Sequence, residues 1–406
     1  MNVFLFIEAR EVEFSALDDI RQRGLSPILF TSRYLNEGHF YHGIDLQRFD
    51  KVYYVDTFDS NAMLDCIRHN AMPVAAVLGS YDEVMIPAAE IADALQLPHP
   101  SLDGLNNAFN KERVRMELNA RGYPQPLYRF FSVDGIPILP AIPYPLVIKP
   151  TRDAGSFSVF LCRTGEQYRA AVAKIRSRDT LSMLGSEHRH FLMEQFIEGP
   201  FYGAELLYNA GRWQVIAINR LFVSAGDSPC ITGIGQPSDL SPECRALAAG
   251  QVVRWAEALG LQGGALNVEF IYAADGPVLV EINLRVSGAR VAQQVALTTG
   301  INMMEHLVDF ACGIERPLNF APAARYPFVA DAFIFSGDGA PPTAMNLNQN
   351  GPFFIAGKVT SQPNLAPGAR RNFGSIIGHV LAHGQTCHEA MDHATAIVRT
   401  LRIKTA

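Results

Sequence analysis

Several familiar signatures are missing from this sequence of 406 residues, and each absence excludes a class of protein. Its six cysteines stand far apart without a C-x-x-C pair, which argues against a disulfide framework or a cysteine metal site. No apolar run approaches the roughly 20 residues that a membrane-spanning helix needs. A basic excess is also missing, because 34 lysines and arginines face 40 acidic residues, and the net charge of −6 argues against general nucleic-acid binding.

A leader segment is not evident either. The chain begins MNVFLFIEAREVEF, with no basic residues before the apolar run and acids directly after it, so this segment predicts a first strand. Together with the cysteine pattern, this start leads us to expect a cytoplasmic protein. A hydrophobic content of 48% and a charged content of 18% predict a sizeable core, and the length predicts two to three domains at roughly 150 residues each.

The first hundred residues alternate between short apolar runs and helical patterns. We expect strands at residues 3–9, 26–32, 51–55 and 73–79, with helices around residues 14–24, 62–69 and 86–97. Such alternation predicts βαβ units and a parallel sheet. No G-x-G-x-x-G follows the first strand, where residues 8–11 read EARE, so a dinucleotide-binding site is poorly supported.

A second unit begins near residue 101. Residues 110–122 predict a helix, which Asn110 can cap and Gly122 can end. The proline-rich residues 124–145 are expected to be connective, and strands at 145–150 and 159–162 precede a charged helix at 165–178. From residue 191 onward we expect strands, interrupted by a long helix over 242–259 and followed by a last helix over 387–401.

Lys149 ends a buried strand and precedes a loop that contains Gly155, Ser156 and Ser158. Small residues let backbone N–H groups approach a polyphosphate, and a lysine adds a point charge. No Walker A sequence G-x-x-x-x-G-K-[ST] occurs in the chain. Taken alone, this segment is more often an ordinary hairpin than a phosphate-binding loop.

Carboxylates interrupt two otherwise apolar strands further along the chain. Glu269 lies in the first, and Glu281 and Asn283 share one face of the second because they are two residues apart. Oxygen ligands of this kind suit Mg²⁺, although an outward-facing glutamate on a half-exposed strand is the ordinary alternative. Arg285 continues the same face and Arg290 follows closely, and an arginine beside such a site can stabilise a transferring phosphoryl group.

Five motifs in order give the chain a resemblance to the ATP-grasp superfamily. They are a helix with Lys111, the strand end LVIKP, the small-residue loop, the run EQFIEG, and Glu269 followed by EINLR. The resemblance covers most of the chain. It is strongest for the carboxylate–amine ligase branch, which includes L-amino-acid ligases and dapdiamide-synthetase-like proteins.

The fold implied by this resemblance is α/β and α+β. An N-terminal Rossmann-like parallel-sheet domain (residues 1–100) precedes a two-lobed ATP-grasp fold, made of a central lid subdomain (101–190) and a C-terminal subdomain with a strand-rich tail (191–406). The implied cofactors are ATP and Mg²⁺, with Mn²⁺ as a substitute. Small-molecule carboxylate and amine substrates and a homodimer are also implied, with no nucleic-acid or membrane partner.

Site residues follow from the resemblance, position by position. The phosphates of ATP are assigned to Lys111, Lys149 and the loop with Gly155, Ser156 and Ser158. The adenine is assigned to Glu194, Gln195, Phe196 and Ile197. Phe201 replaces a ribose-binding glutamate that many relatives carry, so Glu205 is expected to make that contact. The metal is assigned to Glu269, Glu281 and Asn283. Catalytic roles are assigned to Arg285, which faces the acyl phosphate, and to Arg290.

The implied activity is ATP-dependent ligation. A carboxylate attacks the γ-phosphate, and an amine captures the resulting acyl phosphate, giving an amide, ADP and phosphate. An amino acid or small carboxylate in dipeptide, siderophore or other secondary-metabolite synthesis is the expected substrate. Two alternatives stay open: a bicarbonate-activating, carboxylase-like enzyme and a non-catalytic nucleotide-binding regulator.

Two further features leave alternatives open. Arg220 is either a surface charge or an anchor for a substrate carboxylate, and residues 224–240 resemble a substrate-covering loop by position only. His379, His383, His388 and His393 fit packing or surface positions better than a zinc site, because two lie in a strand-like run and two on a helix.

Overall fold

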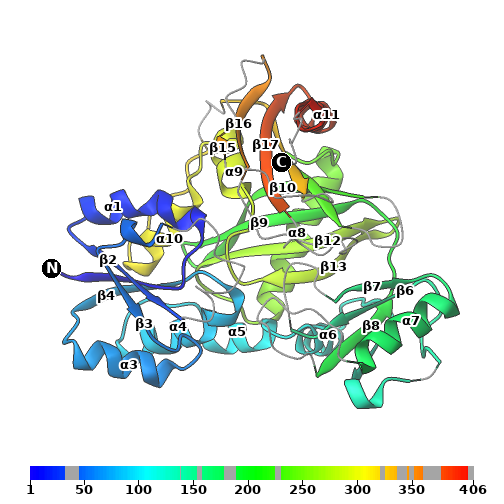
Figure 1. Cartoon of the computed structure of the whole chain (residues 1–406), viewed down its shortest axis with the longest axis horizontal. Coiled ribbons are helices and arrows are strands. Elements are labelled where there is room, and N and C mark those ends of the chain that lie inside the picture. Colours follow the sequence, from blue (N-terminus) through cyan, green and yellow to red (C-terminus); the bar gives the residue numbers. More distant parts are fainter. Residues whose placement is uncertain are drawn as a thin grey trace.

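A computed structural model of the chain describes residues 1–32, 45–137, 139–152, 158–177, 189–224, 230–320, 325–335, 345–346, 352–359 and 376–400. Within these ranges the strands form three sheets. In Figure 1 the N-terminal sheet lies at the left, a second sheet at the lower right, and a large nine-stranded sheet between and above them. All six cysteines are free thiols. None of the described helices is long and apolar enough to cross a membrane.

The N-terminal sheet is parallel, as predicted. Its order is β3-β2-β1-β4, formed by β1 (Val3–Ile7), β2 (Ser26–Thr31), β3 (Lys51–Tyr54) and β4 (Val74–Gly79). One face packs on α3 (Ser60–His69) and α4 (Asp82–Ala94). A 3-10 helix (Glu11–Ala16) and α1 (Leu17–Gln22) contribute to the core on the other face. Burial on both faces explains why the central strands read as continuous apolar runs.

The second sheet is antiparallel in the order β5-β8-β6-β7. It contains β5 (Tyr128–Ser132), β6 (Leu146–Pro150), β7 (Phe160–Cys162) and β8 (His190–Gln195), and its core includes α7 (Gly165–Arg176). Two helices, α5 (Leu102–Ala108) and α6 (Lys111–Ala120), precede it. The prediction of a purely connective segment at 124–145 was wrong for β5, whose aromatic residues pair with β8.

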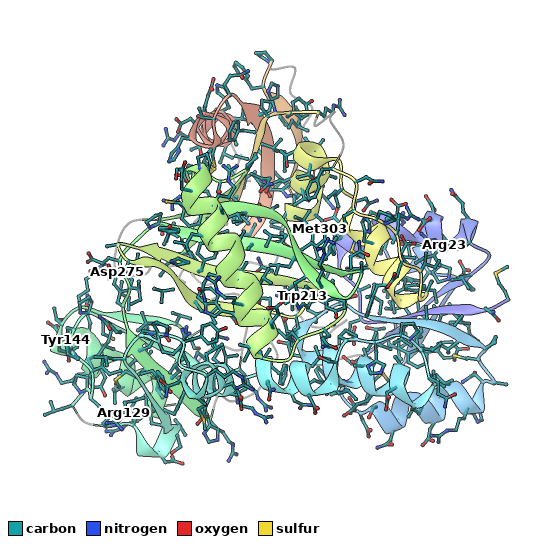
Figure 2. The ribbon with its side chains drawn as sticks, turned by 180° about the vertical axis from the view of Figure 1, so that it is seen from behind. Arg23, Arg129, Tyr144, Trp213, Asp275 and Met303 are labelled. Atoms are coloured by element: carbon teal, nitrogen blue, oxygen red, sulfur yellow. The ribbon has the colours of Figure 1, made fainter. Side chains whose placement is uncertain are left out.

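The large sheet runs in the order β13-β12-β9-β10-β11-β14-β17-β16-β15. Its strands are β9 (Phe201–Asn209), β10 (Arg212–Val223), β11 (Ile231–Gln236), β12 (Ala265–Ala273), β13 (Gly276–Asn283), β14 (Phe328–Phe335), β15 (Met345–Asn346), β16 (Phe354–Val359) and β17 (Ile376–Gly384). The outer face packs on α8 (Pro242–Ala258) and α11 (Cys387–Thr400). Figure 2 shows α8 lying across this face near Trp213.

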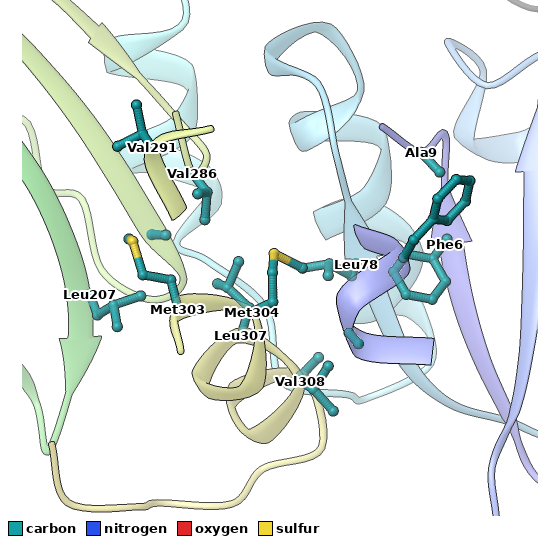
Figure 3. Packing of buried hydrophobic residues seen from close by; sticks show 14 of the residues in the cluster. Phe6, Ala9, Leu78, Leu207, Val286, Val291, Met303, Met304, Leu307 and Val308 are labelled. Carbon is teal, nitrogen blue, oxygen red and sulfur yellow. The ribbon is translucent and has the colours of Figure 1, made fainter. Parts of the chain in front are cut away.

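The opposite, inner face of the large sheet shares a core with the N-terminal sheet. Between them lie α9 (Val291–Thr299) and α10 (Met303–Ala311). In Figure 3 Met303 of α10 points toward Leu207 of the large sheet, while Met304 and Val308 lie on the side of Phe6. Helix α10 was not predicted from the sequence, and it helps to bury the second face of the parallel sheet.

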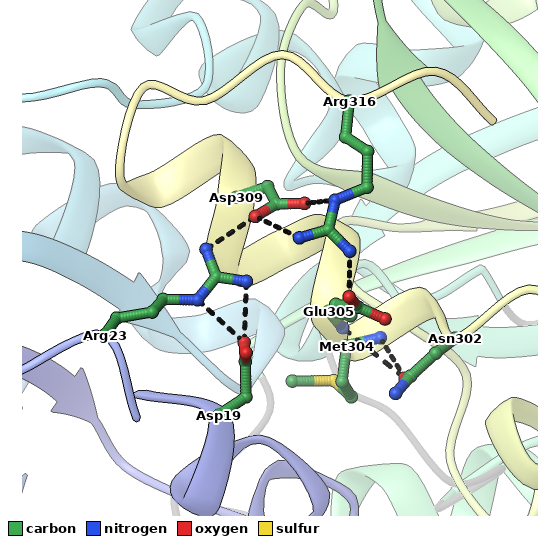
Figure 4. A network of polar contacts seen from close by, with 7 residues as sticks. All are labelled: Asp19, Arg23, Asn302, Met304, Glu305, Asp309 and Arg316. Atoms are coloured by element: carbon green, nitrogen blue, oxygen red, sulfur yellow. Dashed lines mark hydrogen bonds and ion pairs between the residues drawn. The ribbon is translucent and has the colours of Figure 1, made fainter. Parts of the chain in front are cut away.

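An ion-pair network ties α10 to the end of α1 in the N-terminal unit. Asp309 is buried on α10, and its carboxylate lies 2.5 Å from Nη1 of Arg23 and 2.8 Å from Nε of Arg316. Arg23 also pairs with Asp19 at 2.7 Å, and Figure 4 shows the connected chain of contacts. A carboxylate held by two guanidinium groups is well compensated for its burial. The contact therefore holds the N-terminal unit against the large sheet.

Candidate active site

A cavity of about 430 Å³ lies at the β13 edge of the large sheet, between this strand and helices α4 and α6. Helix α4 supplies Asp82 and Glu83, α6 supplies Lys111 and Arg115, and β13 supplies Glu281 and Asn283. Because Asp82 begins the helix after β4, it lies at the carboxyl edge of the parallel sheet, where open α/β sheets place ligand sites.

Lys111 and Glu281, both predicted from motifs, meet in this cavity. Asn110 caps α6 by accepting a hydrogen bond from the Glu112 N–H at 2.8 Å, which fixes Lys111 in the first turn. The Lys111 Nζ atom lies 2.6 Å from Oε1 of Glu281. Two residues far apart in the sequence thus form one polar contact between α6 and the large sheet.

Lys149 and Glu194 form a second cation–carboxylate pair, buried between β6 and β8. Arg115 joins them, with its Nη2 atom 3.0 Å from Glu194 Oε2 and donating to the Leu279 carbonyl of β13 at 2.9 Å. Burial alone would raise the pKa of Glu194, but Lys149 and Arg115 hold it below its ordinary value. The sequence reading missed Arg115, although its spacing of four from Lys111 places both on one face of α6.

Several groups assigned to the adenine already bond to other parts of the protein. The Glu194 carboxylate is engaged as described, the Gln195 N–H donates to the Leu127 carbonyl at 2.8 Å, and the Phe196 N–H donates to the Pro145 carbonyl at 3.1 Å. These two backbone donors are not free for a base. The predicted adenine contact therefore rests on Ile197 and on carbonyl oxygens of the same segment.

Glu269 and Glu281 lie directly opposite each other on β12 and β13. Burial and the adjacent Glu281 charge raise the pKa of Glu269 to about 8, against the charges of Arg285, Lys111 and Lys149, which lower it. Asn283 donates to Asn267 Oδ1 at 2.8 Å and so keeps its own oxygen for another ligand. Two carboxylates and an amide oxygen fit Mg²⁺, which takes few protein ligands and completes its shell with phosphate oxygens and water. No group of three acidic, histidine or cysteine ligands occurs in the described part of the chain.

Glu205, assigned to the ribose, is fully buried on the inner face. Its Oε1 accepts from Asn267 at 2.9 Å and from Asn219 at 3.4 Å, and its Oε2 accepts from the Ser287 N–H at 3.2 Å. Burial raises the pKa of Glu205 to about 7, against these hydrogen bonds, which lower it. The carboxylate thus begins a chain of hydrogen bonds that runs through Asn267 to Asn283. Its contact with ribose stays a prediction.

Arg285 is held by Asp82 of the N-terminal unit. The Arg285 Nε atom lies 2.7 Å from Asp82 Oδ2, and Asp82 Oδ1 accepts from the neighbouring Leu284 N–H at 2.7 Å. Asp82 could not be identified from the sequence, because an acidic residue in the predicted loop after β4 is not by itself a sign of function. The structure makes it the residue that orients the Arg285 guanidinium.

Arg290 lies elsewhere, at the start of α9. Its Nε donates to Nδ1 of His379 at 3.1 Å, its Nη1 donates to Gln293 at 3.2 Å, and its Nη2 lies 3.5 Å from Glu11. The Arg285 side chain instead contacts Asp82. The two arginines are therefore close in the sequence but have no described partner in common. We find no contact that links Arg290 to the residues of the cavity among those the structure describes.

Several predicted features fall outside this geometry. Gly155 and Ser156 lie outside the described residues, whereas Ser158 is described and has a left-handed φ of 55°. Arg220 lies over the Tyr202 ring at 5.0 Å, and Tyr202 belongs to the outer-face core with α8. Because Asn219 faces inward, Arg220 points away from the cavity and does not anchor a substrate there.

The geometry agrees with a family comparison. Residues 142–293 match the family model of the ATP-grasp domain. The chain thus contains a region that matches the ATP-grasp family. Its fold is similar to the crystal structure of L-amino acid ligase from Bacillus licheniformis, with a TM-score of 0.80 at 21% identity over 99% of this chain and 97% of that one. The predicted fold, a parallel N-terminal sheet followed by two antiparallel lobes, is thereby confirmed.

Two curated relatives are distant. An uncharacterized protein of Sinorhizobium fredii is 27% identical over 308 residues, which cover 74% of this chain and 61% of that protein. Carnosine synthase 1 of Mus musculus is 24% identical over 294 residues, which cover 66% of this chain and 34% of the synthase. The matched region thus spans about three fifths and one third of these relatives.

Proposed function

We propose that this protein is an ATP-dependent carboxylate–amine ligase that forms an amide through an acyl phosphate and releases ADP and phosphate. The observation that carries the proposal is that Lys111 pairs with Glu281, which lies opposite Glu269 in the sheet. The charges of Lys149 and Arg285 also act on Glu269. Similar proteins named carnosine synthase and L-amino acid ligase support the same class of reaction.

Nucleotide binding would use the two lysines. Lys111 and Lys149 each have a carboxylate partner in the protein, so both ammonium groups are held in place before any phosphate arrives. Glu269, Glu281 and Asn283 would hold Mg²⁺, or Mn²⁺ in its place, which would neutralise charge on the phosphates. ATP-grasp enzymes use ATP and Mg²⁺ in general, and the pairing of Glu269 with Glu281 fits a divalent cation.

Phosphoryl transfer would use Arg285. Its guanidinium is fixed by Asp82, which lines the cavity, and it would stabilise charge that develops on the transferring group. The reaction needs no protein nucleophile, because the carboxylate substrate itself attacks the phosphorus. Positioning and electrostatics are then the main contributions of the protein.

The substrates are proposed more coarsely. An amino acid or another small carboxylate would be activated, and an amine would accept it, as in dipeptide, siderophore or other secondary-metabolite synthesis. We also propose a homodimer in the cytoplasm, on the resemblance and the cysteine pattern.

A matrix of carboxylates and amines, read out by phosphate release, tests this function. We expect ADP and phosphate only when both a carboxylate and an amine are present, with one amide formed per ADP. AMP and pyrophosphate as products would overturn the proposal. ADP release that depends on bicarbonate without an amine would instead support a carboxylase-like enzyme.

A further inference from the structure

A group of buried oxygen atoms on the inner face of the large sheet lacks hydrogen-bond donors. The five atoms are Asn219 Oδ1, Gln236 Oε1, Gln294 Oε1 and both carboxyl oxygens of Asp331, and none has a partner within the described ranges. Each of the four side chains is exposed by 1% or less. We call these four residues the acceptor patch.

The sheet register brings the patch together. Asp331 of β14 lies directly opposite Ile234 of β11, and Gln294 of α9 donates its Nε2 hydrogen to the Ile234 carbonyl at 2.9 Å. Gln236 is two residues further along β11 and shares the face of Ile234. Arg220 pairs with Gly235, so the next antiparallel pair along this ladder joins Asn219 to Gln236. Strands β10, β11 and β14 and helix α9 therefore converge on one place.

Hydrogen bonds donated by the amide nitrogens fix the orientations of Asn219 and Gln294. The Nδ2 group of Asn219 donates to Glu205, and the Nε2 group of Gln294 donates to the Ile234 carbonyl. With both amide nitrogens engaged, the oxygens are the groups left without a partner. The five unpartnered atoms are all oxygens, and two of them belong to the carboxyl group of Asp331.

The nearest basic groups do not satisfy Asp331. His379 Nδ1 lies 3.9 Å from Asp331 Oδ2, but this nitrogen accepts the Nε hydrogen of Arg290 and has none to donate. Arg290 itself is directed to His379, Gln293 and Glu11. Burial raises the pKa of Asp331 well above its ordinary value, against the charge of Arg290. Folded proteins normally pair such atoms, so a set of unpaired acceptors indicates a missing donor.

We propose that the acceptor patch binds a primary ammonium group of the amine-bearing substrate. An ammonium carries three donors and one positive charge, which complement clustered carbonyl oxygens and a carboxyl group. The identity of the ligand as a substrate rests on the proposed ligase function.

The position of the patch narrows the substrate class. From the patch, hydrogen bonds run through Asn219, Glu205 and Asn267 to Asn283 at the proposed metal site. Strands β12 and β11 are three steps apart in the sheet, a separation of about 14 Å at roughly 4.8 Å per step. The recognised ammonium is therefore remote from the reacting group, at the end of an aliphatic chain, as in a diamine or a basic amino acid.

Calorimetry on the full chain with a non-hydrolysable ATP analogue and Mg²⁺ tests the proposal. L-lysine and L-norleucine differ chiefly in the terminal ammonium, and we expect lysine to bind at least about tenfold more tightly. Asp331→Asn and Gln236→Met should each remove most of this preference. Gln214→Met, a half-buried position on β10, is the matched control and should leave the preference intact.

The other results of this experiment would contradict either the ammonium site or the proposed ligase function. Equal affinity for lysine and norleucine would overturn the proposal, and so would a lysine preference that both variants retain. Occupation of the patch by K⁺, seen as KCl-dependent binding without any amine, would overturn it as well. Gln236→Met serves as the test if Asp331→Asn does not fold. Asp331-dependent lysine binding without any ligation would contradict the proposed function alone, whereas ligation without ammonium preference would contradict this inference alone.

Discussion

The inner face of the large sheet has two halves that differ in whether their buried polar side chains have hydrogen-bond partners. On β9, β12 and β13, Glu205, Asn267 and Asn283 bond to one another, and Glu281 is paired with Lys111. On β10, β11 and β14, the oxygens of the acceptor patch have no partner among the described residues. The first half is organised by the protein itself, as sites that stabilise developing charge usually are. The second half is complementary to a group that the protein does not supply.

Breaking the organised half should have the largest effect. Glu281→Ala removes one carboxylate of the Glu269 pair and the partner of Lys111, so we expect a loss of roughly 10²–10³-fold or more in ligation rate. Because Glu281 lies on an edge strand, the fold should survive, with an unchanged circular dichroism spectrum. Full ADP release by the folded variant would remove the metal assignment.

Glu205, at the border between the two halves, should make the stability of the folded protein depend on pH. Its pKa of about 7 in the folded protein lies above the ordinary 4.5, so the folded state binds more protons than the unfolded state between these values. Stability should therefore fall as pH rises from about 4.5 to about 7, by an amount on the order of 3 kcal/mol from this group.

Urea unfolding at pH 5 and pH 8 measures this dependence. Glu205→Gln, which does not titrate, should show a smaller loss of stability than the wild type over the same interval. Identical pH slopes for the two proteins would show that Glu205 stays ionised within its network.

The contact between the N-terminal unit and the organised half should give a smaller effect. Asp82→Asn keeps the shape of the side chain but weakens the hold on Arg285, and residues that orient a functional group typically contribute about 10–100-fold. We expect kcat to fall by about tenfold with little change in KM for ATP.

A matched control is Asp103→Asn, at an exposed position in the first turn of α5. It should leave kcat unchanged. A rise in KM for ATP with constant kcat in the Asp82 variant would show that Asp82 acts in nucleotide binding rather than in orienting Arg285.

The organised half was largely predictable from the sequence, and the acceptor patch was not. Glu281 and Asn283 share a face because of the two-residue period of a strand, and Lys111 and Lys149 lie in short motifs. Asp82 and Arg115 were missed because their partners are far away along the chain. Asp331 interrupts an apolar run, but its unpaired state depends on β11, β17 and α9, which no local pattern brings together.

The same reasoning applies to the fold. The parallel sheet was predicted because each strand is a local apolar run bounded by turn residues. Helix α10 was not predicted, since its burial comes from contacts with β1 and β4, which precede it by more than 200 residues. The β5 strand was hidden by the prolines around it.

Oxygen transfer tests the central claim most directly. A carboxylate substrate found in the screen is labelled with ¹⁸O and ligated with its amine and ATP. In the proposed reaction a carboxylate oxygen bonds to the γ-phosphorus, and the amine then breaks the bond between that oxygen and the acyl carbon. One labelled oxygen should therefore appear in the released phosphate at each turnover, and unlabelled phosphate would contradict the account.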